Sequence, residues 1–245
     1  MDHPELLLYF FGVALLYSSA GFGGGSSYLA ILVLFDLAMF QVRSTALLCN
    51  IVVVAGSVYI FYRSGWLDFR RAAPLALTSI PAAFIGGWLP IEPTLFYLLL
   101  GISLLSAALL MWFQPRLPVE GTPKKGARWL GPLIGGGIGF LSGMVGIGGG
   151  IFLAPVLYFI RWDIPKRIAA VAAFFILVNS ISGMLGQMTN PAFKIEWAFS
   201  LYLMLAVLAG GQIGVRLTIN KLSPASIKRI TALLIFLVGI RLLLH

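Results

Sequence analysis

The sequence predicts an all-α integral membrane protein made of two inverted-topology repeats, each a re-entrant helical hairpin followed by three transmembrane helices. Three observations lead to this fold class. The chain is strongly apolar, its ten apolar segments divide into two sets of five, and each set contains the same cluster of glycines. The clusters, at residues 21–25 and 146–150, both read G-x-G-G-G and lie 125 residues apart.

The composition places the chain in a membrane. Hydrophobic residues make up 60% of it, charged residues 10%, and the mean hydropathy is +0.98, whereas about 25% of the residues in a soluble domain are charged. Ten-residue segments of alternating hydropathy, which would indicate a transmembrane β-barrel, are absent. The single cysteine, Cys49, excludes a disulfide framework. The net charge of +9 resides in short loops between apolar segments, which argues against nucleic-acid binding.

The order of the apolar segments indicates an internal duplication. A linker over residues 114–127, with three prolines and two lysines, separates five segments from the next five. The predicted domains are therefore a first transmembrane repeat (1–113), the linker (114–127) and a second transmembrane repeat (128–245). The segments lie at about 5–17, 22–35, 44–62, 72–89, 94–113, 128–142, 149–160, 168–188, 197–215 and 229–244.

The segments on either side of each glycine cluster are too short to cross a bilayer. They hold about 12 to 15 residues, and a crossing needs about 20. Each pair is therefore either one broken span or a re-entrant hairpin, and the two arrangements distribute the 17 Lys and Arg residues differently. Broken spans divide them 8 to 9, whereas hairpins place 14 on one side and 3 on the other. Because cytoplasmic loops carry an excess of basic residues, hairpins are preferred.

The hairpin arrangement also predicts an orientation. Each repeat crosses the membrane three times, so the second repeat begins on the opposite face and the topology is inverted. The basic side, which includes the 114–127 linker, is cytoplasmic. We therefore expect a multi-pass protein of the inner (cytoplasmic) cell membrane with both termini outside.

The glycine clusters break their helices and expose backbone amides. Glycine is unfavourable inside a helix, and the second arm of each hairpin begins near the last glycine, where unpaired N–H groups and the helix dipole attract anions. Hairpins entering from opposite faces bring these N-termini together at mid-membrane, which predicts a small-anion site. Close helix packing is the alternative role of such glycines. The expected substrate-binding residues here are Gly23, Gly24, Gly25, Ser26, Ser27, Gly148, Gly149, Gly150, Ile151 and Phe152.

Polar side chains at membrane depth extend the predicted site. Asn50 in the first half, and Asn179 and Ser180 in the second, are expected to bind the substrate. An interhelical hydrogen bond is the alternative role for an asparagine in a membrane. The sequence leaves open whether Cys49 or Gln212 touches the substrate.

Charged residues near the predicted spans are few. Arg43 and Arg167 each follow a hairpin, where they either meet an anion at the mouths of the path or anchor the chain at the membrane interface. No Asp, Glu, Lys or His lies in the middle of a predicted span, which argues against a proton pump or a cation exchanger. The two histidines are terminal and cannot form a catalytic pair. We expect no enzymatic activity, no cofactor and no metal.

The glycine clusters and the duplicated organisation resemble the TauE/SafE family of sulfite-exporter-like membrane transporters, also called TSUP. Two further stretches carry the resemblance, Gly-Gly-Gly-Ile-Phe-Leu-Ala-Pro at 148–155 and Val-Asn-Ser-Ile-Ser-Gly at 178–183. The resemblance covers nearly the whole chain. It implies a secondary transporter that exports small sulfur-containing anions such as sulfite or organosulfonates. The first cluster departs from the second, since Ala30 stands where the second half has Pro155.

Two other classes of protein remain open from the sequence. One is an anion channel of the same architecture, and the other is a membrane assembly subunit that transports nothing. The expected partners are a small anion of the sulfite or organosulfonate class and the lipid bilayer, and a homo-oligomer is left open.

Overall fold

Helices make up almost all of the described chain. The computed structural model describes residues 3–19, 22–35, 37–113, 130–191, 193–220 and 224–244. The predicted linker at 114–127 and Gly21 of the first cluster lie outside the described residues. The helices are α1 (Glu5–Ser19), α2 (Gly25–Leu34), α3 (Met39–Arg63), α4 (Phe69–Trp88), α5 (Pro93–Trp112), α6 (Leu130–Val145), α7 (Gly150–Phe159), α8 (Pro165–Met188), α9 (Trp197–Asn220) and α10 (Pro224–Leu243).

Each predicted apolar segment corresponds to one helix, and local chemistry accounts for several helix starts. Pro93 and Pro165 begin α5 and α8, at a position where the N–H that proline lacks would have no helical partner. Asp68 caps α4, because its side chain accepts a hydrogen bond from the Arg70 amide at 2.9 Å. The order of elements therefore follows directly from hydropathy and capping.

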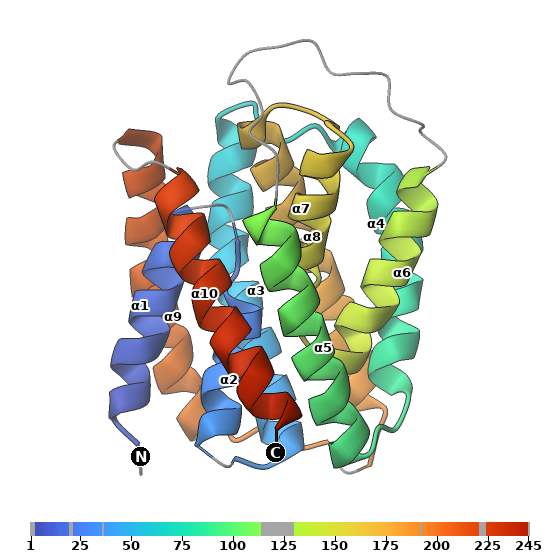
Figure 1. The fold of residues 1–245 in the computed structure, drawn as a ribbon, viewed down its shortest axis with the longest axis vertical. Helices are drawn as coiled ribbons and strands as arrows, with labels where there is room; N and C mark the ends of the chain where they lie inside the picture. Colours follow the sequence, from blue (N-terminus) through green and yellow to red (C-terminus); the bar gives the residue numbers. More distant parts are fainter. Residues whose placement is uncertain are drawn as a thin grey trace.

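Two pairs of short helices turn back inside the bundle. In Figure 1, α1 begins and α2 ends at the lower end of the molecule, whereas α6 begins and α7 ends at the upper end. These four helices hold 10 to 16 residues, fewer than the roughly 20 that a crossing needs. The other helices run from one end toward the other, and α1 begins at the end where α10 finishes (Figure 1).

One helix of each sequence half packs against helices of the other half. α4 packs mainly against α6 and α8, and α9 packs mainly against α1 and α3. Glycines permit the close approach: a Cβ at Gly86 would overlap the carbonyl oxygen of Phe140, and one at Gly214 would overlap that of Leu15. Small residues serve this role at helix interfaces in membranes. Each hairpin is therefore covered by a helix from the other half, while α3 with α8 and α5 with α10 join the halves.

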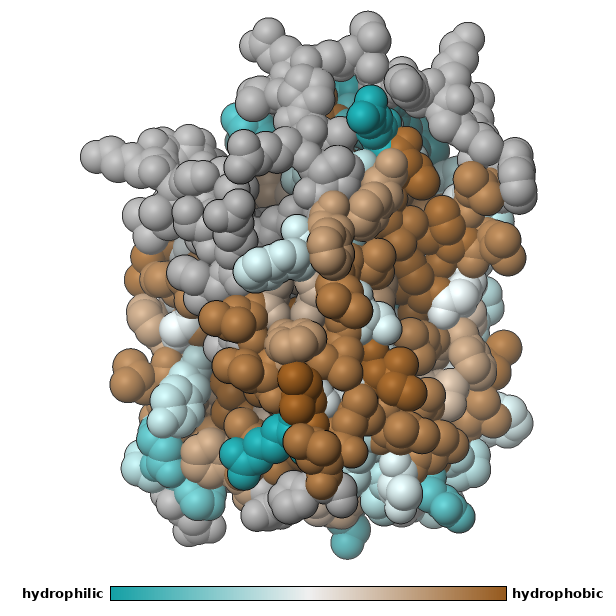
Figure 2. Space-filling model, in the orientation of Figure 1, coloured by the Kyte–Doolittle hydropathy of each residue, from teal (hydrophilic) through white to brown (hydrophobic). Residues whose placement is uncertain are grey.

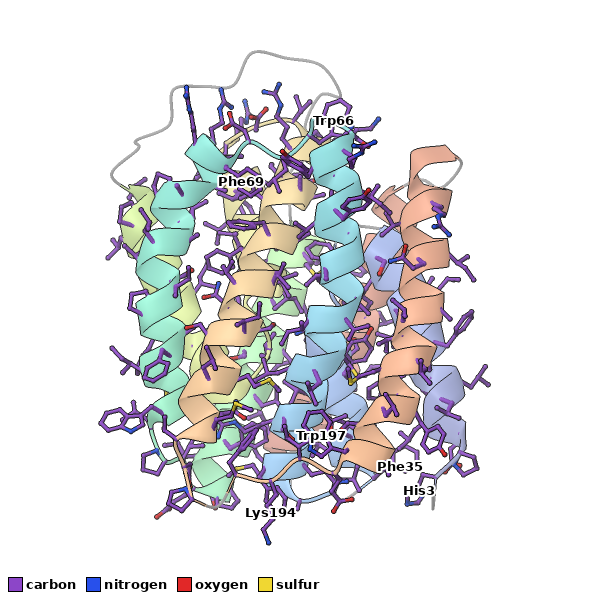
Figure 3. The ribbon with its side chains drawn as sticks, turned by 180° about the vertical axis from the view of Figure 1, so that it is seen from behind. His3, Phe35, Trp66, Phe69, Lys194 and Trp197 are labelled. Carbon is purple, nitrogen blue, oxygen red and sulfur yellow. The ribbon has the colours of Figure 1, made fainter. Side chains whose placement is uncertain are left out.

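Many large apolar side chains are exposed on the outer surfaces of the helices. Figure 2 shows a hydrophobic band across the middle of the face that it presents. Figure 3 places Trp66 and Phe69 near one end and Trp197 near the other, and membrane interfaces enrich aromatic residues in this way. Four helices in the described ranges are long and apolar enough to cross a membrane, as expected of a multi-pass helical protein. They are Met39–Arg63, Pro93–Phe113, Pro165–Met188 and Trp197–Arg216.

Candidate functional site

The two glycine clusters form matching turns at the inner ends of the hairpins. α2 begins at Gly25 and α7 begins at Gly150, 125 residues later. The residue before each helix is a left-handed glycine, with φ of 87° at Gly24 and 80° at Gly149, a conformation that other residues rarely adopt. No side chain caps either helix. Both turns therefore present backbone to their surroundings.

The first two backbone amides of α2 and of α7 donate no hydrogen bond within their own helix. In α2 the Ser27 amide donates to the Gly24 carbonyl at 2.9 Å, and in α7 the Phe152 amide donates to the Gly149 carbonyl at 3.1 Å. The two amides before these bonds stand at the positive end of each helix, where anions bind. They belong to Gly25, Ser26, Gly150 and Ile151.

Asn50 of α3 lies between the two turns and is fully buried. Its Nδ2 donates to the carbonyl oxygen of Ile147 at 3.0 Å, and its buried Oδ1 has no partner in the described part of the chain. Side chains on the neighbouring glycines would collide with it. A Cβ at Gly23 would lie 2.5 Å from Oδ1, and a Cβ at Gly148 would lie 2.8 Å from Nδ2. The glycines thus let an asparagine of the first half reach the turn of the second.

Asn179 and Ser180 of α8 differ in their relation to the second turn. Ser180 is fully buried, and its Oγ has no partner within the described ranges; a Cβ at Gly148 would lie 2.9 Å from that oxygen. Asn179 donates from Nδ2 to the Phe175 carbonyl of its own helix at 2.8 Å. The 125-residue offset relates Asn50 to Phe175, so Asn179 lies one helical turn beyond the matching position. Ser180 is thus the α8 side chain that stands against the glycine turn.

A narrow pocket lies between the two turns, with room for about one water molecule in this conformation. Residues of both turns line it together with side chains from α1, α3 and α8. None of these residues is charged. The lining consists of Tyr17, Phe22, Gly23, Gly24, Gly25, Ser26, Asn50, Ile147, Gly150, Ile151 and Ile176.

The pocket contains most of the residues that the sequence singled out, and some that it did not. Ser27 lies behind the lining, where its Oγ is 2.6 Å from the Tyr17 hydroxyl. Gly148 and Gly149 shape the second turn beside the pocket. Sequence reasoning missed Tyr17, although its place in the last turn before the first glycine cluster could have identified it.

Buried hydroxyl groups without partners surround the turns. The Oγ atoms of Ser18 and Ser142 and the hydroxyl of Tyr28 have no hydrogen-bond partner among the described residues. A Cβ at Gly24 would lie 2.9 Å from the Tyr28 hydroxyl, and one at Gly149 would lie 3.3 Å from Cβ of Ser142. Because buried polar groups in proteins are nearly always paired, donors of this kind point to a ligand or to water.

The two arginines that follow the hairpins have different surroundings. Arg167 lies 3.5 Å from the Asp163 carboxylate, and its side chain is 39% exposed. Arg43 is buried, and its Nη2 donates to the carbonyl oxygen of Gly143 at 3.3 Å. Anchoring at a membrane interface therefore fits Arg167 but does not describe Arg43, which lies inside the protein.

The remaining candidates lie away from the pocket. Cys49 is fully buried in the apolar core. Gln212 of α9 packs against Gly56 of α3, where a Cβ would overlap its amide. The residues described in the structure include no group of three or more His, Cys, Asp or Glu that could hold a metal ion.

Known proteins resemble this chain over nearly its whole length. The family model described as "Sulfite exporter TauE/SafE" matches residues 6–242. The probable membrane transporter protein y4hK of Sinorhizobium fredii is 31% identical over 245 residues, which cover 97% of each chain. A probable membrane transporter protein of Methanocaldococcus jannaschii is 25% identical over 264 residues, covering 98% of this chain and 95% of its own. No solved structure matches the chain.

Proposed function

Because the chain belongs to the TauE/SafE family of membrane transporters, we propose that it carries small sulfur-containing anions, such as sulfite or organosulfonates, outward across the inner membrane. The anion is held midway by backbone amides of the two glycine turns, and the protein opens alternately to either side. The observation that carries this proposal is the pair of uncapped helix N-termini at one pocket.

The charge around the pocket suits an anion. The described lining contains no carboxylate, and a carboxylate would repel an anion strongly in a medium of low dielectric constant. The two helix N-termini together contribute about one elementary positive charge, since each carries about half. The amides and the Ser26 hydroxyl supply several donors, and a compact oxyanion such as sulfite or a sulfonate group accepts several hydrogen bonds at once.

The size of the pocket favours a carrier over a channel. A sulfite ion does not fit a space for about one water molecule, so we assign this conformation to a state in which the two hairpins are closed on each other. The two hairpins must separate to admit the anion. A channel instead needs a continuous path of binding sites across the membrane.

We further propose that the two halves are inverted repeats. Three relations support this: the hairpins turn back from opposite ends (Figure 1), α4 and α9 are exchanged in equivalent ways, and the left-handed glycines Gly24 and Gly149 share the 125-residue offset. The corresponding helices are five places apart in the chain: α1 and α6, α2 and α7, and α4 and α9. Inverted repeats are a common basis of alternating access.

The proposed orientation has the upper end of Figure 1 in the cytoplasm. Basic residues gather at the connections of that end, whereas the lower end has Arg43, Lys194 and Arg241. Cytoplasmic loops carry such an excess. The membrane potential then drives an anion outward, with about 2.3 kcal/mol per charge for each 100 mV. The basic residues of that end whose side chains the structure describes are Arg63, Arg70, Arg71, Arg161, Lys166, Arg167 and Arg216.

Flux into liposomes that contain the purified protein tests the proposal. Sulfite, sulfate, thiosulfate, sulfoacetate and chloride form the substrate panel. We expect saturable uptake of sulfite or a sulfonate, acceleration by unlabelled substrate on the far side, and no single-channel currents.

A pair of glycine variants tests the site itself. Gly149→Leu should abolish flux, because it forces a side chain into a left-handed position at the turn. Gly137→Ala is the matched control, since a Cβ there meets nothing within 4 Å. Unchanged flux in a folded Gly149→Leu protein contradicts the amide site, and a wild-type protein that moves no sulfur anion contradicts the substrate class.

A further inference from the structure

Arg43 is a buried cation without an anionic partner among the residues that the structure describes. The residue is only 7% exposed, and its buried Nε has no hydrogen-bond partner in the described part of the protein. The one described contact of its guanidinium is the hydrogen bond from Nη2 to the Gly143 carbonyl oxygen, at 3.3 Å. Within the described ranges, no carboxylate lies within 4 Å of this guanidinium.

Three other cations of the chain show what Arg43 lacks. Arg71 and Arg167 both bind the Asp163 carboxylate, and each is about 40% exposed to solvent. Lys166 lies over the ring of Trp66, with its Nζ 4.9 Å from the centroid. Burial of a charge without a counter-charge costs free energy. The burial of Arg43 therefore points to an anion that comes from outside the chain.

Arg43 faces the same turn as Asn50. The two residues lie seven positions apart on α3, which is two helical turns, so they share one face of the helix. Asn50 donates to the Ile147 carbonyl, and a Cβ at Gly146 would lie 3.6 Å from Cβ of Arg43. The α6–α7 turn thus runs along α3 between these side chains. Arg43 lies toward the start of α3, at the end of the bundle where the chain also begins and ends (Figure 1).

We propose that Arg43 forms a second anion position, between the glycine-turn pocket and the end of the bundle where α3 begins. This inference rests on the proposed anion transport and specifies one step of the path. The ligand is a sulfur oxyanion with at least two free oxygens, because a planar guanidinium pairs with two oxygens at once. In the proposed orientation, Arg43 receives the anion after it leaves the glycine turns and before it reaches the outside.

A purely structural role for Arg43 predicts different behaviour. The Gly143 carbonyl is one of the last in α6, and arginine side chains stabilise helix C-termini in this way. Arg43→Gln keeps an N–H donor for that carbonyl but removes the charge. Arg43→Lys keeps the charge but loses the planar group. If Arg43 only caps α6, both variants change the stability of the protein and leave its affinity for the anion unaltered.

Sulfite transport and sulfite protection against thermal unfolding, both measured on the purified full-length protein, test the proposal. Arg43→Gln should raise the KM for sulfite about tenfold or more and abolish the increase in Tm that sulfite gives the wild-type protein. Arg43→Lys should raise KM less. Arg241→Gln is the matched control, because Arg241 is exposed in the last turn of α10 at the same end of the molecule, and it should leave both measurements unchanged.

The outcomes separate this inference from the proposed function. A folded Arg43→Gln protein with the wild-type KM and the wild-type sulfite protection overturns the anion position at Arg43. If Arg43→Gln does not fold, Arg43→Lys decides, and an unchanged KM with unchanged protection overturns the proposal. A wild-type protein that neither transports nor binds a sulfur oxyanion contradicts the proposed function itself. Wild-type transport with unaffected Arg43 variants contradicts only the inference.

Discussion

The Nδ2 of Asn50 donates to the carbonyl oxygen of Ile147 at 3.0 Å, across 97 residues of sequence. The same side chain lies against the first glycine turn, where a Cβ at Gly23 would be 2.5 Å from Oδ1. One residue of α3 therefore contacts both turns of the candidate site. A movement of either hairpin must change the surroundings of this amide.

Asn50→Asp tests the charge of the site at nearly constant shape. The two helix N-termini stabilise a carboxylate between them, so the variant should fold. The carboxylate repels the substrate anion, so the flux should fall about tenfold or more. Both substitutions lose the hydrogen bond to the Ile147 carbonyl, but Asn50→Ala adds no charge and should have a smaller effect on flux. Liposome flux and thermal unfolding of both variants provide the measurement. Equal effects of the two substitutions would show that charge is irrelevant at this position.

Gly150→Ala tests how tightly the second turn is packed. A Cβ at this position would overlap the end of the Ile176 side chain, and such overpacking costs about 1–3 kcal/mol. Ile176→Ala removes the atoms that collide, so the double variant should be more stable than the sum of the single effects by about 1 kcal/mol or more. The measurement is the apparent Tm, in detergent, of the wild-type protein, the two single variants and the double variant.

A second cycle serves as the control for that result. Gly137→Ala combined with Ile176→Ala should be additive, because a Cβ at Gly137 has no neighbour within 4 Å. Additivity in the Gly150 cycle as well would contradict the packing described for the turn.

Asp163→Asn should destabilise the end of the molecule opposite to Arg43. The Asp163 carboxylate has 1% exposure, binds Arg71, lies 3.5 Å from Arg167 and accepts from the Ile164 amide at 2.8 Å. Its neutralisation leaves Arg167 without its carboxylate and leaves Arg71 with only Asp68, at 3.6 Å. Both arginines are partly solvated, so we expect a loss of about 1–3 kcal/mol. Thermal unfolding measures this loss. Glu92→Gln, at an exposed residue without a side-chain capping bond, is the control and should change little.

Single-cysteine labelling tests the orientation. Cys49 is fully buried, so Cys49→Ala should give a functional background without reactive thiols. In that background Ser64→Cys, in the α3–α4 connection, should react with a membrane-impermeant reagent only after cells are opened. Lys194→Cys, in the α8–α9 connection (Figure 3), should react on intact cells. The reverse pattern would place the termini in the cytoplasm and contradict the proposed orientation.

Hydropathy predicted the ten helices because the apolar character of a segment is a local property. The largest differences, of five residues, are at the end of α9, at the start of α10 and at the start of α3, which we expected near residue 44 and which begins at Met39. Hydropathy treats polar residues as solvated, but Gln41 and Arg43 are buried by the protein, and the Gln41 amide donates to the Glu196 carboxylate at 3.4 Å. Such partners are distant in sequence and cannot be read from one segment.

The glycine turns were predictable for a similar reason, since a left-handed backbone at Gly24 or Gly149 is imposed locally. The side chains around them were harder to assign. Consecutive helical residues point about 100° apart, so hydropathy could not show that Ser180, and not its neighbour Asn179, stands against the turn. Burial of Arg43 depends on where the last turn of α6 lies relative to α3, which a list of spans does not specify.

The exchange of α4 and α9 between the halves has a consequence for biosynthesis. The second hairpin, α6–α7, emerges from the ribosome after its covering helix α4, and can pack as soon as it is made. The first hairpin is made at the start, yet its covering helix α9 is the last but one to be synthesised. The glycine turn encoded first is therefore the one completed last, and a chain that stops before α9 has made both turns but not the helix that covers the first hairpin.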